Sequence, residues 1–159
     1  MNNKSKIVAG IAGIGVAVAV GLGSAGGAGA AHGGALATGT FDGRAEVATA
    51  ATNDKIVGDP NGRGEVYVFS TGGGVICYVL ETDKIAPATA AHIHEAAAGS
   101  NGPVVVTLSA PTNGSSAGCI DTGDADLAAD ITLRESSNYY VNVHNAEYPG
   151  GAIRAQLGT

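Results

Sequence analysis

Short runs of β-branched and aromatic residues, separated by glycine-rich turns, follow one another along most of the chain. Residues 65–70 and 75–80 are two such runs, and the Thr-Gly-Gly-Gly segment at 71–74 between them has the composition of a hairpin loop. Both runs are apolar on both faces, so we expect this hairpin in the middle of a sheet rather than at its edge. Shorter runs with strand character lie at 91–95, 103–108, 138–145 and 151–157.

This pattern predicts an all-β fold. About seven or more short strands with turn signals between them, and no long amphipathic helix, indicate an antiparallel β-sandwich of the Greek-key or immunoglobulin-like kind. A closed barrel is the alternative architecture. Residues 110–124, rich in Gly, Ser, Thr and Asp, are predicted to form a loop, and residues 124–133 one or two helical turns with Asp124 or Asp126 as the N-cap.

The alternation of side chains along the strands gives the histidines a direction. His92 and His94 share one face of their strand while Ile93 takes the other, and His144 lies on the face opposite Val143. Because the core claims the apolar faces, we expect all three histidines to point outward. The residues expected beside them are Asn142, Arg154 and Gln156, and those expected in the core are Ile93, Val141, Val143, Ile153 and Leu157.

Two uses of this outward surface are open. In the preferred interpretation, the histidines form with Asn142, Arg154 and Gln156 a hydrogen-bonding patch, and the chain is a non-catalytic binding or structural module. In the alternative, His92, His94 and His144 bind copper or zinc, which imidazole ligands suit, and Glu95 or water completes the site. The chain has no Ser-His-Asp order, phosphate loop or zinc-protease motif, so we do not expect an enzyme.

The N-terminus has the pattern of an export signal. Lys4 and Lys6 precede an uncharged apolar run at 7–22, and an Ala-Gly-Ala site follows at 28–30. We therefore predict a signal peptide at 1–31, with an uncleaved anchor as the alternative, then a flexible lead at 32–37 and a single domain at 38–159. The mature protein is expected outside the cytoplasm and free of the membrane.

The net charge limits the classes of partner that we expect, and the cysteine content indicates the cellular compartment. The formal net charge is −6, and it becomes −8 once Lys4 and Lys6 are removed with the signal. An acidic chain without a basic patch repels nucleic acid, which excludes it as an expected partner. The two cysteines, Cys77 and Cys119, are expected to form a disulfide in an oxidising compartment, with two free buried thiols as the alternative.

The chain resembles the CHRD domain, the module named after its repeats in chordin and also found singly in exported bacterial proteins. The resemblance covers about residues 36–157 and depends on two blocks. The first combines Ala-His-Ile-His at 91–94 with Gly-Pro-Val-Val-Val at 102–106, and the second combines Tyr-Tyr-Val-Asn-Val-His at 139–144 with the segment 148–157. Ala152 departs from the family, which commonly has a glutamate there. The resemblance implies an extracellular location and a protein, glycan or small ligand as partner.

A weaker similarity is to the copper half of copper/zinc superoxide dismutase, which also has a His-x-His strand and a later Val-x-Val-His strand. That enzyme holds its copper with four histidines. Apart from the three above, this chain has only His32. We therefore do not expect a working dismutase.

Overall fold

The computed structural model describes residues 36–50, 52 and 54–159. The predicted signal peptide at 1–31 and residues 32–35 of the predicted lead lie outside this part. Leu36 and Ala37, also assigned to the lead, instead begin the first strand. Within the described residues, no helix is long and apolar enough to cross a membrane.

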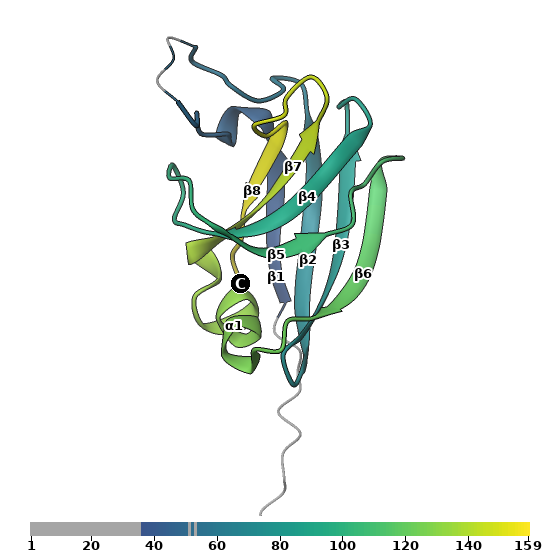
Figure 1. The fold of residues 1–159 in the computed structure, drawn as a ribbon, viewed down its shortest axis with the longest axis vertical. Coiled ribbons are helices and arrows are strands. Elements are labelled where there is room, and N and C mark those ends of the chain that lie inside the picture. Colours follow the sequence, from purple (N-terminus) through teal and green to yellow (C-terminus); the bar gives the residue numbers. More distant parts are fainter. Residues whose placement is uncertain (1–35, 51, 53) are drawn as a thin grey trace, which may run out of the picture.

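In the described part of the chain, eight strands form one antiparallel sheet in which sequence neighbours are not always spatial neighbours (Figure 1). They are β1 (Leu36–Asp42), β2 (Arg63–Gly72), β3 (Val75–Asp83), β4 (Ala88–Glu95), β5 (Val104–Leu108), β6 (Ser115–Asp121), β7 (Tyr139–Asn145) and β8 (Ile153–Gln156). Their order across the sheet is β5-β4-β7-β8-β1-β2-β3-β6. The crossovers from β3 to β4 and from β6 to β7 make the topology of the Greek-key type, and the predicted all-β class is confirmed.

The sheet curls until its two edge strands approach each other. Ser109, just after β5, donates its backbone N–H to the Tyr78 hydroxyl over 2.8 Å, and Ser116 of β6 donates its hydroxyl to the Ser109 carbonyl over 2.7 Å. These contacts bring β5 to β3 and β6, so the architecture lies close to the closed barrel that the sequence left as an alternative.

The apolar faces of the strands fill the interior as the alternation predicted. Ile93, Val141, Val143 and Ile153 are fully buried, and Leu157 is 3 % exposed. The β2–β3 hairpin lies inside the sheet, flanked by β1 and β6, which agrees with its two apolar faces. Loops and helical turns occupy the two ends: the long connection between β1 and β2 lies at one end and α1 at the other (Figure 1).

The predicted helical turns are present at 125–134. α1 (Ala125–Ala129) begins after Asp124, whose side chain accepts hydrogen bonds from the N–H groups of Asp126 and Leu127, so Asp124 is the N-cap. A π-helical turn, Asp130–Arg134, continues it and buries Ile131 in the core. Two 3₁₀ turns complete the helical segments, η1 (Gly43–Ala45) and Ser136–Asn138.

The prediction of a loop at 110–124 is wrong for residues 115–121, which form strand β6. Cys119 lies directly opposite Cys77 of β3, with Cα atoms 4.0 Å apart, and the two form the expected disulfide. Small polar residues form a strand here because backbone pairing with β3 satisfies their hydrogen bonds, and such composition suits an edge strand with little burial.

Candidate metal centre

The three histidines come from neighbouring strands. β4 and β7 pair antiparallel, with His92 opposite Asn142 and His144 opposite Ala90, so His92 and His144 are diagonal neighbours on one face. His94 is two residues along β4 from His92, on the same face. All three side chains are half-buried. The sheet thus brings together residues that are 52 positions apart in the sequence.

Ligand nitrogens of the three imidazoles converge. His92 Nδ1 lies 3.2 Å from His144 Nε2, and one nitrogen of each of the three histidines lies within 4.8 Å of the others. In a tetrahedral site with bonds of 2.0–2.1 Å, ligand nitrogens are about 3.3 Å apart. The pair His92–His144 already has that spacing, and the nitrogen of His94 lies within 4.8 Å of the other two.

Two of the imidazoles are held in a single tautomer by backbone carbonyls. His94 Nδ1 lies 3.0 Å from the Gly102 carbonyl oxygen, and His144 Nδ1 lies 3.0 Å from the Pro149 carbonyl oxygen. A carbonyl only accepts, so each Nδ1 carries the proton and donates it, and each Nε2 carries a lone pair. The lone pair of His144 Nε2 accepts a hydrogen bond from His92 Nδ1 over 3.2 Å. A protonated nitrogen on a carbonyl is the usual outer support of a metal-binding histidine.

The His94 Nε2 atom is buried and has no hydrogen-bond partner among the described residues. A buried polar atom without a partner costs free energy and calls for an explanation. A metal ion bound to this lone pair would supply the missing interaction.

The loop after β4 places the carbonyl that supports His94. Residues 96–102 turn back on the strand until Gly102 packs on the backbone of Glu95, where an added Cβ would lie 1.8 Å from the Glu95 carbonyl oxygen. Only glycine permits this approach. The Glu95 N–H also donates to the Pro103 carbonyl over 3.1 Å, which fixes the return of the chain.

The β7–β8 hairpin places the carbonyl that supports His144. The Asn145 side chain accepts hydrogen bonds from the N–H groups of Glu147 and Tyr148, at 3.0 and 2.8 Å. This Asx turn directs residues 146–150 back over β7 and brings the Pro149 carbonyl to His144.

The environment keeps all three imidazoles neutral. Burial lowers the pKa of His92, and the neighbouring His144 and His94 lower it further. Burial is also the largest cause that lowers the pKa of His94 and of His144. Since a metal competes only with protons for the ligand nitrogens, neutral imidazoles are the form that binds.

Loops cover two members of the predicted outward patch. Asn142 and Arg154 do point to the outer face of the sheet, but they are only 4 % and 1 % exposed. Strand alternation assigns a face, and it does not say whether loops cover that face. Here the segments 46–48 and 96–102 cover it: Glu46 accepts from Asn142, and the Ala97 carbonyl accepts from Arg154. Asn101 joins the two segments through hydrogen bonds to the carbonyls of Val47 and Ala48.

Glu46 is the main member of the site that sequence reasoning did not single out. It comes from the β1–β2 connection, and its two carboxyl oxygens accept from the Asn142 amide at 2.8 and 2.9 Å. Burial raises the pKa of Glu46 to about 8, against the lowering effects of Arg154 and the Asn142 hydrogen bond. In the sequence, Glu46 lies among small apolar residues and one threonine at 45–50, so nothing there indicated a partner 96 residues away.

The other two predicted residues have structural contacts. Gln156 donates to the carbonyls of Ala96, Ser137 and Tyr139, which fastens the loop after β4 to the sheet. Glu95 is exposed at the end of β4 and does not belong to the group of converging ligand atoms. The structure therefore brings together His92, His94 and His144 without Glu95.

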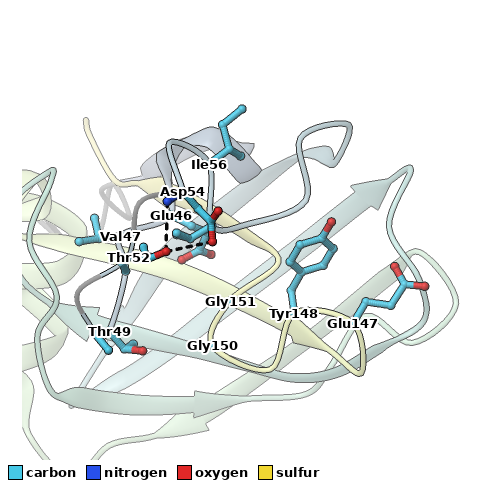
Figure 2. Close-up of a pocket in the computed structure, with 13 residues that line it drawn as sticks. Glu46, Val47, Thr49, Thr52, Asp54, Ile56, Glu147, Tyr148, Gly150 and Gly151 are labelled. Carbon is cyan, nitrogen blue, oxygen red and sulfur yellow. Dashed lines mark hydrogen bonds between the residues drawn. The ribbon is translucent and has the colours of Figure 1, made fainter.

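A cleft of about 470 Å³ adjoins the site, and none of the three histidines lines it. Glu46, Thr52 and Asp54 line it from the β1–β2 connection, and Tyr148 and Gly151 line it from the β7–β8 hairpin (Figure 2). The Pro149 carbonyl bound to His144 belongs to the same hairpin, so one wall of this cleft also supports the histidine cluster.

Fold and site together define an antiparallel Greek-key β domain with a cluster of three neutral histidines on its outer face. The family model of the CHRD domain matches residues 37–157, and the chain belongs to this family. No curated protein and no solved structure matches the chain. The resemblance identified from the two sequence blocks is confirmed, while export, partners and lack of catalysis stay predictions.

Proposed function

We propose that this CHRD domain is an exported, non-catalytic binding module whose ligand is a copper or zinc ion held by His92, His94 and His144. The observation that carries the proposal is the direction of the lone pairs. Two imidazoles use their Nδ1 protons on backbone carbonyls, so that both Nε2 atoms carry a lone pair. The His94 Nε2 has no partner among the described residues, and the His144 Nε2 shares a hydrogen bond with His92 Nδ1, whose proton a metal ion would replace. This is a donor set of three neutral nitrogens, which suits copper and zinc and not the oxygen-preferring cations.

The same geometry argues against a purely structural use of the histidines. A core or surface histidine is stable once both ring nitrogens have partners or water. His94 Nε2 has neither a partner nor access to solvent. The disulfide favours an oxidising compartment, where copper and zinc are available to an exported protein.

Metal retention tests the proposal. The purified protein is equilibrated with Cu²⁺ or Zn²⁺ at pH 7, dialysed against metal-free buffer, and analysed for metal by mass spectrometry. We expect about one equivalent of one of these metals in the wild type and a loss of at least tenfold in affinity in His92→Ala, His94→Ala and His144→Ala.

The control is Glu147→Gln, because Glu147 is an exposed residue outside the group of converging ligand atoms. It should retain metal as the wild type does. No stoichiometric metal in the wild type, or equal retention after removal of any of the three clustered histidines, would overturn the proposal.

A further inference from the structure

A buried cation lies behind the histidine cluster. The guanidinium carbon of Arg154 is 3.4 Å from the centroid of the Tyr140 ring, and the His94 imidazole stacks on the same ring with centroids 4.7 Å apart and planes 6° from parallel. β7 carries Tyr140 and lies between β4 with His94 and β8 with Arg154. The phenol ring therefore separates a guanidinium from a candidate metal ligand.

The charge of Arg154 has little compensation nearby. Its guanidinium donates to three neutral oxygens, those of the Ala97 carbonyl and of the Gln156 and Asn101 amides. Among the described residues, no carboxylate oxygen lies within 4.0 Å of it. Burial is the largest influence and lowers the pKa of Arg154, while Tyr140 and Glu46 act on it electrostatically in the opposite direction. With a pKa of about 8 the Glu46 carboxyl is mostly protonated at pH 7. A guanidinium itself keeps its proton in proteins.

The histidine cluster adds no negative charge either. Its three ligands are neutral imidazoles, and it contains no carboxylate or thiolate. A bound ion would keep its full formal charge in a half-buried site that faces a buried cation. The repulsion from Arg154 is twice as large for a doubly charged ion as for a singly charged ion at the same position.

We infer that the three-histidine site favours copper as Cu(I) over Cu(II), because the Arg154 guanidinium behind Tyr140 penalises the higher ionic charge. This inference rests on the proposed function, since it specifies the ion that the same site holds. Three nitrogen ligands also suit the low coordination number of Cu(I), whereas Cu(II) prefers a tetragonal set with more donors. Charge and coordination number thus favour the same oxidation state.

Two affinities measured separately test the inference. The wild type is titrated anaerobically with Cu(I) against bicinchoninate, and in air with Cu(II) against a nitrogen chelator, and the reduction potential of the copper protein is measured directly. We expect a potential above that of copper with three equivalents of free imidazole bound, recorded in the same buffer.

Variants of Arg154 test whether its charge causes the preference for Cu(I). Arg154→Gln removes the charge and Arg154→Lys keeps it, while both lose the planar stack on Tyr140. Relative to the wild type, Arg154→Gln should lower the preference for Cu(I) at least tenfold, which is 59 mV for a one-electron couple. Arg154→Lys should stay within threefold. The control Arg44→Gln removes an exposed arginine that pairs with Asp42 and should change nothing.

The possible outcomes separate the two proposals. Failure of the wild type to bind copper in either oxidation state overturns this inference, and failure to retain zinc as well overturns the proposed function. Stoichiometric copper with a potential no higher than that of the imidazole reference, or with the same preference in the wild type and Arg154→Gln, overturns only the Cu(I) inference. If Arg154→Gln does not fold, the reduction potential of the wild type still tests whether the site favours Cu(I).

Discussion

Glu46 connects the β1–β2 connection to the outer face of the sheet through a single carboxyl group. Its neighbours there are the Asn142 amide, which donates to it, and the Arg154 guanidinium, which acts on it electrostatically. Burial is nevertheless the larger influence and raises its pKa from 4.5 to about 8. A carboxyl that is protonated in the folded state and ionised in the unfolded state makes stability depend on pH.

The sign of this pH dependence follows from the number of protons that the folded and the unfolded state bind. Between pH 4.5 and 8 the folded state holds a proton on Glu46 that the unfolded state has lost, so stability is greatest at the acid end and decreases as pH rises towards 8. The histidines act oppositely, since their lowered pKa values remove stability as pH decreases below 6.5. Near pH 6.5 the two effects overlap, because the unfolded histidines still bind protons there; the Glu46 contribution, at most about 1.4 kcal/mol per pH unit, is therefore read from the difference between the wild type and Glu46→Gln.

Urea unfolding at several pH values between 6.5 and 8 checks this prediction. Relative to Glu46→Gln, whose amide does not titrate, the wild type should lose stability as pH rises over this range, while the contribution of the histidines is common to both proteins. Glu147→Gln, at an exposed acid on the opposite wall of the cleft, should keep the wild-type slope. An identical slope in the wild type and Glu46→Gln would contradict the prediction.

Gly151 is the second residue on which this arrangement depends. Its φ is +140°, and an added Cβ would lie 2.5 Å from Glu46 Oε2 and 2.6 Å from Asn142 Nδ2. Gly151→Ala should therefore cost about 1–3 kcal/mol in the free energy of unfolding, through backbone strain and displacement of the Glu46 carboxyl. The neighbouring Gly150→Ala is the control, because nothing lies within 4 Å of its Cβ position. Equal losses in urea unfolding would show that Gly151 has no special role.

At the scale of elements, β6 depends on its connection to β3. It is an edge strand with alternating exposed and half-buried residues, so it has little apolar burial of its own. Seven paired residues and the Cys77–Cys119 disulfide attach it to β3. The covalent link closes a loop of 42 residues, which removes about 4 kcal/mol of conformational freedom from the unfolded chain in the chain-entropy model.

Removal of the disulfide should be costly for this reason. The double variant Cys77→Ala/Cys119→Ala is expected to lose about 2–5 kcal/mol of stability, measured by urea unfolding. The wild type under reducing conditions is the control and should match the variant. An unchanged unfolding midpoint would mean that backbone pairing with β3 is sufficient to hold β6.

At the scale of the whole molecule, metal binding and folding are coupled. The ligands lie on β4 and β7, and their supporting carbonyls lie in the two loops that follow β4 and β7, so only the folded chain assembles the site. A ligand that binds only the folded state stabilises it by about 2.7 kcal/mol at a free concentration one hundred times its Kd.

Thermal unfolding with added Zn²⁺ checks the coupling without redox chemistry. At such a concentration, Tm should rise by roughly 10 °C in the wild type, as expected for a domain of this size. In His144→Ala, the Tm with added Zn²⁺ should equal the Tm of the same variant measured with a chelator. A rise of equal size in the wild type and in His144→Ala would assign the effect to metal bound elsewhere.

Local patterns in the sequence determined the class of fold and the direction of the histidines. The period of two assigned Ile93, Val141 and Val143 to the core and the histidines to the opposite face, because successive strand residues point to opposite sides. Strong apolar runs likewise predicted the β2–β3 hairpin, and an aspartate before a short apolar segment predicted the capped helix at 125–129. These features depend on neighbours in the chain, which the sequence contains directly.

Only the tertiary structure decided which residues distant in the sequence are neighbours in space. The small polar residues of β6 become a strand only because β3 offers its edge, and Arg154 and Asn142 become buried only because two distant loops cross their face. The convergence of His92 and His144 depends on the register between β4 and β7, which long-range pairing sets. The charge that Arg154 places behind Tyr140 and His94 likewise arises from three strands brought together in the folded sheet.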